Sequence, residues 1–513
     1  MIGGVNYLIS LILLITPAMC GSLDLWIQTI IRLLILILIL ISILKKEISL
    51  HFSHSLSVPL FLFLFFCFIS IFSSANLYES KNEFFNILTY IAFFYFAKNV
   101  DRKYIIVPVL ISGVVLSLYA FYQKFNSCGN SPSFMNNPNV FAGYLVGCML
   151  ITFSFTTTFF SSAQNKIRII LLSLFFLALF FTGSMAGLIS AILGVLFFVY
   201  LKKIVIQKKY LFIICGIIIF LLIAKFFEKQ SFDRVVWWLT AGKMILARPI
   251  SGVGLGAFAD AYQKYKLVGL NSLYAHNYFL QLASEIGVFG FTAFIWFLIK
   301  IFKFRKTSEN IPFFAAIFAM LFHSIFDYTL TIPANAILFW LMLCCCSSEE
   351  RLTSIPLAQN YKTIFRWIAI FLILWTVHSQ VMIFLASRNL AIGKYCFDKK
   401  KYDIAEIHFL NAIKYDNKNP QAYFFLSNVH QQYYKITSYK SYLFEAEIEL
   451  LSAAKLQKYN PQIYFDLFNG CYLRGDMQNA VLWMKKTLDV APKSVYYEKC
   501  YENLLKEIHN AKK

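Results

Sequence analysis

The sequence predicts an all-α fold, a polytopic membrane bundle of about 12–13 spans followed by a C-terminal α-solenoid. Of the 513 residues, 59% are apolar and only 14% are charged, and the mean hydropathy is +0.63. A soluble globular domain has about 45–50% apolar and about 25% charged residues. Composition therefore excludes a soluble enzyme, a disulfide-stapled secreted domain and a disordered tail for most of the chain.

The charge density predicts where the bundle ends. Residues 388–513 hold 32 charged side chains in 126 positions, whereas residues 1–387 hold 41 in 387 positions. We therefore predict a membrane domain over 1–387 and a helical repeat domain over 388–513. The net charge of +21 does not imply nucleic-acid binding, because cytoplasmic loops of membrane proteins collect Lys and Arg.

Thirteen apolar runs approach the length needed to cross a bilayer as a helix, which is about 17–25 residues. The run at the N-terminus is not a convincing signal peptide, because no Lys or Arg precedes it. We therefore keep it as a span. The predicted spans are 5–20, 25–44, 56–73, 84–98, 104–122, 138–160, 167–183, 185–201, 210–227, 278–301, 311–327, 331–346 and 365–387.

Basic residues predict the orientation of these spans. Short Lys- and Arg-containing segments follow spans two, four, six, eight and ten and precede span thirteen, so they all fall on one side. The positive-inside rule makes that side cytoplasmic. The repeat domain and the longest connection, 228–277, are then on the outside, and long connections are usually functional.

Residues Val235–Leu246 of this outward loop have helical spacing, and Arg248-Pro249 ends the predicted surface helix. Gly252, Gly254 and Gly256 follow. They resemble part of a dinucleotide fingerprint, but that fingerprint needs a strand before it and a helix after it within a βαβ unit, and we expect neither here. Two interpretations stay open, a flexible turn between surface helices and a backbone that approaches a phosphate closely.

Arg234 is the most informative cation of the loop, because apolar residues and Trp237-Trp238 follow it. An Arg at an apolar interface is costly unless it is paired or hydrated. It either binds an anionic ligand through its planar fork or reaches lipid headgroups. Lys264 and Lys266 are explained well enough by a solvated face.

Three further polar residues lie near the predicted outer edge of the membrane. His276 stands where span ten begins and can exchange a proton near neutral pH. His323 and Asp327 are four apart, so we expect them on one helix face, either as a local pair or in support of the site. No second His or Cys has metal-ligand spacing, so we expect no metal site.

Five segments together resemble the O-antigen ligase superfamily of membrane glycosyltransferases. The segments cover about residues 130–330. They read FMNNPNVFAGYL, TGSMAG, RVVWWLTAGKMILARPISGVGLGAF, HNYFLQLASEIGVFGF and HSIFDY. The resemblance implies many helices, a large periplasmic loop and location in the bacterial inner membrane. It also implies transfer of a glycan from a polyprenyl-pyrophosphate carrier to a lipid or protein acceptor, with no cofactor.

The resemblance assigns roles to individual residues. The His of the family's H-N motif falls on His276, and a family Arg falls on Arg234. Another family Arg is replaced by Met185, so either a different cation substitutes or this chain is divergent or inactive. We expect His276 and Arg234 to be catalytic, Arg248, Lys243, Gly254, Gly256 and Asn277 to bind substrate, and His323 and Asp327 to support the site.

The expected chemistry is a single inverting displacement. Fixed cations would neutralise the leaving pyrophosphate, and His276 would take the acceptor proton or orient the leaving group. No carboxylate pair is expected in the outward loops, which disfavours a double displacement. Two alternatives remain, a transporter or flippase for lipid-linked glycans and an inactive scaffold that recruits glycan-assembly partners.

Residues 388–513 resemble a three-unit tetratricopeptide array. Pro461, Ala480 and Pro492 have the offsets of one such unit, and small residues recur where two helices would cross. The array either stabilises the membrane part or docks a protein partner. The three sets are Gly393, Ala405, Phe409 and Ala412; Tyr423, Leu426, Ala446, Leu450 and Ala453; and Tyr464, Leu467, Ala480, Met484 and Pro492.

Overall fold

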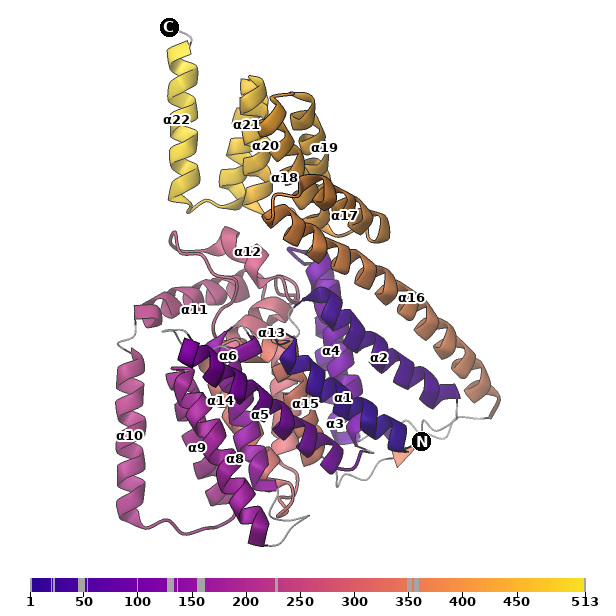
Figure 1. Cartoon of the computed structure of the whole chain (residues 1–513), viewed down its shortest axis with the longest axis vertical. Coiled ribbons are helices and arrows are strands. Elements are labelled where there is room, and N and C mark those ends of the chain that lie inside the picture. The colour runs from indigo at the N-terminus through magenta and orange to yellow at the C-terminus, as the bar shows by residue number, and fades with distance from the viewer. Residues whose placement is uncertain are drawn as a thin grey trace.

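The computed structural model is a helical bundle with a stack of further helices beyond one end (Figure 1). The predicted all-α membrane bundle is confirmed. In the described part, the only strands are the two-residue β1 (His51–Phe52) and β2 (Thr353–Ser354), which pair antiparallel. The structure describes residues 2–19, 21, 24–44, 51–52, 54–98, 100–126, 133–135, 137–154, 162–226, 229–347, 353–354 and 359–511.

Every predicted span falls on a helix, although 155–160 of span six lie outside the described residues. Within the described residues, three helices are long and apolar enough to cross a membrane, namely α5, α13 and the segment Arg366–Asp398 of α16, and seven shorter helices are also apolar. The span helices are α1 (Ile2–Ala18), α2 (Leu25–Leu44), α3 (His54–Phe72), α4 (Leu77–Ala97), α5 (Lys103–Asn126), α6 (Pro138–Ile151), α8 (Ser162–Phe181), α9 (Met185–Leu201), α10 (Lys208–Phe226), α13 (Tyr278–Phe302), α14 (Ile311–Phe326), α15 (Pro333–Cys346) and α16 (Gln359–Asp398).

Helices α6 and α15 lie at the centre of the bundle. All residues of α15 are buried, and so are Val140–Ile151 of α6. A helix that is apolar on every side is stable only where other helices surround it. The short helical turns η2 (Ser133–Met135), η3 (Thr152–Ser154) and η4 (Thr329–Thr331) flank these two central helices.

Arg32, a charged residue inside the predicted span 25–44, was missed by the sequence reasoning. Arg32 of α2 is 2% exposed and makes hydrogen bonds to Asn82, Asn86, Gln28 and Gln380. Its bond to the Asn86 amide oxygen is bidentate, at 3.0 and 2.8 Å. Amide oxygens of α2, α4 and α16 thus satisfy a buried guanidinium, which ties these three helices together.

The long loop contains two helices, α11 (Lys229–Ala247) and α12 (Phe258–Tyr265). The predicted helix over Val235–Leu246 and its end at Arg248-Pro249 are therefore confirmed. Helix α11 lies crosswise to α10 at the end of the bundle that faces the C-terminal helices (Figure 1). That end of the bundle is the predicted outer side.

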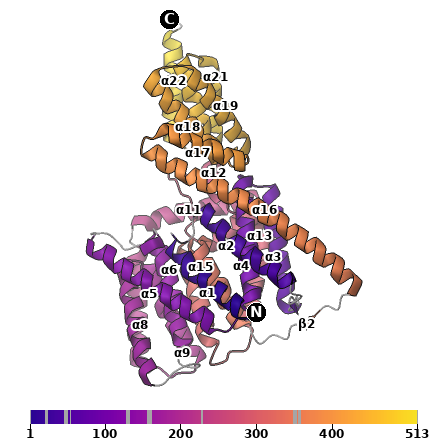
Figure 2. The same ribbon diagram turned by 45° about the vertical axis from the view of Figure 1, so that its right-hand side comes forward.

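Helix α16 runs unbroken through the predicted domain boundary at 387/388 and packs on both α2 and α17. Figure 2 shows it rising from the bundle into the C-terminal helices. The three predicted repeat sets lie on the packed pairs α16–α17, α18–α19 and α20–α21, except for Pro492, which follows α21. The C-terminal helices after α16 are α17 (Tyr402–Tyr415), α18 (Pro420–Thr437), α19 (Ser441–Leu456), α20 (Pro461–Arg474), α21 (Met477–Val490) and α22 (Val495–Ala511).

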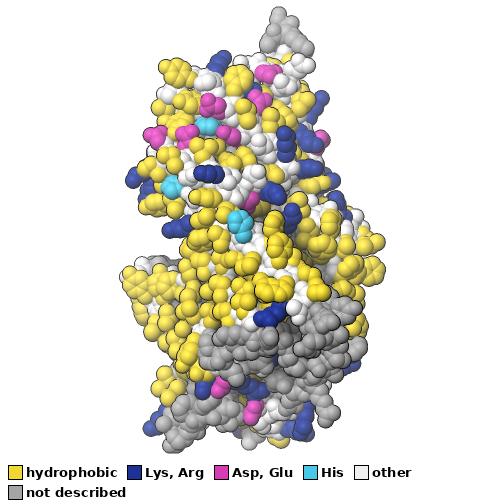
Figure 3. Space-filling view, turned by 90° about the vertical axis from the view of Figure 1, so that its right-hand side faces the viewer, with side chains coloured by type: hydrophobic (Ala, Val, Ile, Leu, Met, Phe, Trp, Pro, Cys, Tyr) yellow, Lys and Arg dark blue, Asp and Glu magenta, His cyan; other side chains and the backbone are white. Residues whose placement is uncertain are grey.

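The surface of the protein also differs between the helical bundle and the C-terminal helices. In Figure 3, hydrophobic side chains gather over the helical bundle, while charged side chains gather over the C-terminal helices and at the opposite end of the bundle. A broad apolar belt between two charged ends is the pattern expected for a protein that crosses a bilayer.

Candidate active site

His276 lies between two aromatic side chains from other parts of the chain. Its ring stacks on Trp237 of α11, with centroids 4.6 Å apart, and meets Tyr328 edge-to-face at 5.0 Å. Its backbone has φ +49°, a left-handed conformation that non-glycine residues rarely adopt. Such strained residues gather at functional sites, and the side chain is 21% exposed and therefore accessible.

Asp327 is the carboxylate nearest His276. The distance from its Oδ1 to His276 Nδ1 is 3.8 Å, and the side chain is 2% exposed. The same oxygen accepts a hydrogen bond from the Tyr328 N–H at 2.7 Å. A buried carboxylate at this distance stabilises a positive charge on the imidazole when the ring takes up a proton.

The expected placement of His323 and Asp327 on one helix face is wrong. Helix α14 ends at Phe326, and Asp327 has an extended backbone, so the four-residue spacing no longer places the two side chains in register. His323 is fully buried, and its Nδ1 lies 2.8 Å from the Thr329 hydroxyl. Asp327 thus faces the predicted catalytic His276, while His323 holds the turn that follows α14.

Arg234 is 4% exposed and belongs to the helix that contacts His276. Trp237 and Trp238 follow it by three and four residues, so they share its helix face. The Trp238 indole N–H donates to the His276 carbonyl oxygen at 3.4 Å. One face of α11 therefore presents both the predicted phosphate-binding guanidinium and the residues that hold His276.

Tyr328 connects the motif segments and was missed by the sequence reasoning. Its hydroxyl accepts a hydrogen bond from the Asn137 amide at 3.0 Å, and its ring stacks on Tyr274 with centroids 3.8 Å apart. Burial raises the pKa of its phenol above the ordinary value, so it stays protonated. The signal in the sequence was its position directly after a carboxylate at a helix end, in a motif that was already singled out.

The glycine-rich segment packs on a kink of α13 and is not a flexible turn. Gly252, Gly254 and Gly256 all have positive φ. The Val253 and Gly254 N–H groups donate to the Ser284 and Glu285 carbonyls at 2.9 and 3.0 Å. A Cβ at Gly252 would collide with the Glu285 carbonyl, and one at Gly254 with Ser74. Close backbone packing therefore explains these two glycines without a phosphate.

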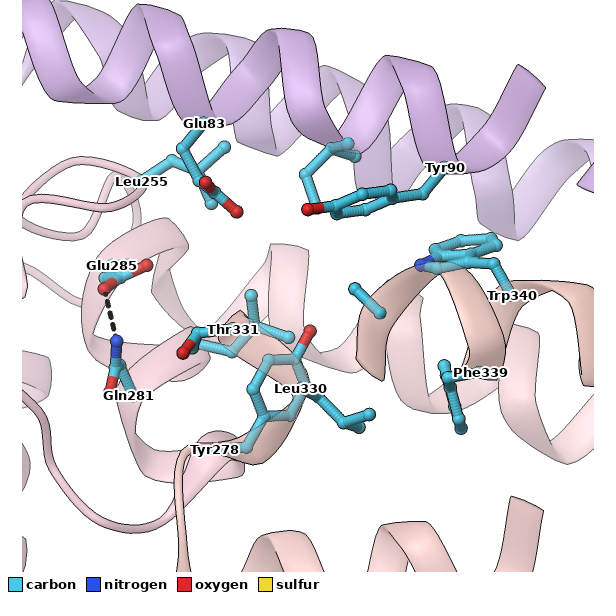
Figure 4. A pocket seen from close by; sticks show the side chains of 13 residues that line it. Glu83, Tyr90, Leu255, Tyr278, Gln281, Glu285, Leu330, Thr331, Phe339 and Trp340 are labelled. Atoms are coloured by element: carbon cyan, nitrogen blue, oxygen red, sulfur yellow. Dashed lines mark hydrogen bonds between the residues drawn. The ribbon is translucent and has the colours of Figure 1, made fainter. Parts of the chain in front are cut away.

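Glu285 anchors the same loop from α13. Its Oε2 accepts the Gly256 N–H at 2.8 Å, and its Oε1 accepts the Gln281 amide at 3.1 Å. Figure 4 shows this pair on the wall of a small cavity of about 20 Å³, with Glu83 of α4 on another wall. Tyr90, Tyr278 and Trp340 also line this cavity (Figure 4).

The remaining predicted substrate-binding residues have varied surroundings. Arg248 donates to the Ser73 carbonyl, which links the glycine segment to the α3–α4 connection. Lys243 is exposed on α11. Asn277 caps α13, since its side chain accepts the Leu280 N–H at 3.0 Å. Met185, which replaces a family Arg, is half-buried at the start of α9.

Two expectations about charges in the outward loops are wrong. Lys266 is 3% exposed and donates to Gln263 and Asn271, so it is not part of a solvated face. Glu79, Glu83 and Asp260 line one cavity, so the outward segments do bring carboxylates together. Glu79 and Glu83 are only four residues apart, so the sequence does contain this pair, whereas Asp260 is far from both along the chain.

Comparison with known proteins addresses the resemblance directly. The family described as O-Antigen ligase matches residues 170–295. A putative polysaccharide ligase of Rickettsia prowazekii is 25% identical over 283 residues, covering 48% of this chain and 67% of the relative. The resemblance to the O-antigen ligase superfamily is confirmed.

Two further relatives have the same description. Putative polysaccharide ligases of Rickettsia conorii and Rickettsia typhi are 24% and 25% identical, covering 49% and 39% of this chain and 69% and 56% of the relatives. The O-antigen ligase match runs from α8 to α13 and contains Arg234 and His276. It ends before Asp327 and Tyr328 and excludes all the C-terminal helices.

Proposed function

We propose that this chain transfers a glycan from a polyprenyl-pyrophosphate carrier to a hydroxyl group of a lipid or protein, at the outer face of the inner membrane. The observation that carries the proposal is the cluster around His276. One face of α11 carries both buried Arg234 and the tryptophans that hold this His, and Asp327 faces its ring. The polysaccharide-ligase relatives support the same reaction class.

The reaction joins the acceptor oxygen to the anomeric carbon. As that bond forms, the bond from this carbon to the pyrophosphate oxygen breaks, and the pyrophosphate leaves with the electron pair. Arg234 would hold the leaving group through paired N–H donors. His276 would take the acceptor proton, and Asp327 would stabilise the resulting imidazolium; general-base catalysis of this kind contributes about 10²–10⁴-fold.

The proposal includes a topology. The end of the bundle that carries α11 and α12 would face the periplasm, with the C-terminal helices on the same side. Residues 1–387 would form the membrane domain and 388–513 the repeat domain, with α16 passing from one into the other. Labelling of single cysteines introduced next to Arg234 and His276 tests whether both lie on the outer face.

The decisive test of function is transfer by the purified chain in vesicles that contain a polyprenyl-pyrophosphate-linked oligosaccharide and an acceptor. We expect His276→Ala and Arg234→Ala each to lower the rate by about 100-fold or more. His378→Ala, an exposed histidine of α16, is the matched control and should keep the wild-type rate. Wild-type rates in both site variants would refute the assignment.

The same vesicles separate a transferase from a flippase. A transferase consumes carrier that is already in the outer leaflet, and its product is glycosylated acceptor. A flippase would move labelled carrier between leaflets without forming that product. An inactive scaffold would do neither.

A further inference from the structure

A cavity of about 830 Å³ lies between the outward end of the bundle and the C-terminal helices. Its volume falls in the range of about 300–1,000 Å³ typical of ligand pockets. Helix α12, the segment 271–274 and the start of α4 form one wall. The opposite wall comes from the α19–α20 connection, the start of α22 and Gln421 of α18.

The lining is rich in groups that bind hydroxyls. Nine of the 26 lining residues are Asn or Gln, five are aromatic, four are carboxylic acids and one is Lys. Amides both donate and accept hydrogen bonds, while carboxylates accept several at once. The aromatic rings offer flat apolar faces beside this polar surface. The aromatic residues are Phe258, Tyr274, Tyr459, Tyr496 and Tyr497.

Hydrogen bonds fix the polar groups of the two walls relative to each other. Asp260 of α12 accepts from Asn76 at 3.1 Å and also from Gln457, which lies just beyond α19. Lys264 lies 5.5 Å from the centre of the Tyr459 ring across the same boundary. Lys266 is held by Gln263 at 2.9 Å and Asn271 at 3.1 Å. The cavity is therefore organised before any ligand arrives.

The charges of the residues that line the cavity limit which classes of ligand it can bind. Four carboxylic acids against one lysine disfavour a phosphate or another anion. Among the described residues, no group of three or more His, Cys, Asp or Glu side chains could hold a metal ion. Apolar lipid is disfavoured by the many amides. An uncharged ligand with many hydroxyl groups satisfies all three conditions.

We propose that this cavity binds the sugar chain of the substrate as a neutral oligosaccharide, so that the C-terminal helices select the glycan. The inference rests on the proposed transferase function and extends it to a part of the chain outside the O-antigen ligase match. Tyr274 connects the two sites, since it lines the cavity and stacks on Tyr328, which contacts His276. The cavity therefore borders an aromatic side chain that belongs to the His276 cluster.

Binding can be measured without transfer. The probe is prepared from cells that make this protein. Mild acid releases the oligosaccharides from their polyprenyl-linked glycans, and the uncharged fraction of these oligosaccharides is used. Titration calorimetry with the full-length, detergent-solubilised chain should detect binding. Tyr496→Ala should weaken it about tenfold, as expected for the loss of one aromatic contact. Tyr439→Ala is the matched control, because this tyrosine is 68% exposed against 62% for Tyr496 and does not line the cavity.

The outcomes separate this inference from the proposed function. His276→Ala should abolish transfer but bind the oligosaccharides as the wild type does. No binding by the wild type, or equal binding by Tyr496→Ala and the wild type, would overturn the inference and leave the transferase proposal intact. Competition by inorganic pyrophosphate would also overturn it, because the cavity would then be an anion site.

Discussion

The His276 cluster and the large cavity are neighbouring regions built in opposite ways. The cluster uses few residues, most of them from segments that resemble the O-antigen ligase superfamily, and places two aromatic rings against one imidazole, with Tyr274 stacked on the second ring, Tyr328. The cavity uses many amides and carboxylates from segments that are far apart along the chain. Only Tyr274 connects the two regions directly, since it lines the cavity and stacks in the cluster.

This difference separates reaction from recognition. Under the proposed function, a general base and a buried cation must be placed accurately. Arg234 lies within α11, and His276 directly precedes the cap of α13, so helices fix the position of both. Recognition of hydroxyl groups can instead be spread over many weak contacts. Under the two proposals, the bundle would carry out the reaction and the C-terminal helices would select the glycan.

Replacement of Gly252 should damage both regions and have the largest effect. In Gly252→Ala, the new Cβ collides with the Glu285 carbonyl in a left-handed backbone, so we expect the free energy of unfolding to fall by about 3 kcal/mol or more. Transfer should be lost with it. Gly242→Ala in α11, where a Cβ meets open space, is the control and should be neutral or slightly stabilising in thermal unfolding. Equal stability of the two variants would contradict the packing of this loop.

Removal of Arg32 should weaken the support beneath the cavity. Arg32→Met leaves the oxygens of Asn82, Asn86 and Gln380 without their buried donor, at a cost of about 2–4 kcal/mol. Its partner Gln28 also lines the cavity, so oligosaccharide binding should fall as well. Chemical denaturation or thermal unfolding measures the first effect, and an unchanged midpoint would show that the network is not structural.

Replacement of Asp327 should affect the reaction alone. Asp327→Asn keeps the size of the side chain but removes the charge that faces His276. We expect kcat to fall about tenfold, equivalent to about 1.4 kcal/mol, while KM and oligosaccharide binding stay unchanged. A change in KM with constant kcat would instead place Asp327 in substrate binding.

Replacement of Glu79, which lines the cavity, should have the smallest effect. It should change only how the thermal stability of the protein depends on pH. Burial raises its pKa from 4.5 to about 7, and the negative charges of Asp260 and Glu83 add to the shift. Because the folded pKa is raised, its contribution to stability is full below about pH 4.5 and is lost as the pH rises through about 7. Glu79→Gln should therefore lose less thermal stability than the wild type between pH 5 and pH 8. An identical pH dependence would contradict the shift.

The sequence predicts the helical bundle well because hydrophobic runs of membrane length leave few alternatives. Every predicted span falls on a helix, and the end of α11 at Arg248-Pro249 follows from a local rule. The helical pairs of residues 388–511 agree with the predicted repeat positions, although their tetratricopeptide character stays a prediction.

Site geometry was harder to predict, because it depends on contacts between distant segments. Motifs predict His276 and Arg234 as site residues, but the placement of Asp327 on one helix face with His323 is wrong, since α14 ends one residue before Asp327. Lys266 was assigned to solvent because no local pattern shows that Gln263 and Asn271 enclose it. The cavity itself has no sequence signature, since only the fold brings α12 and α22 to its opposite walls.

The separation of reaction from recognition is tested most directly by one experiment, steady-state transfer kinetics of His276→Ala and Tyr496→Ala in the same vesicles. We expect His276→Ala to lower kcat by about 100-fold or more with little change in KM, and Tyr496→Ala to raise KM about tenfold with kcat retained. A wild-type kcat in His276→Ala, or a lowered kcat with constant KM in Tyr496→Ala, would contradict the account.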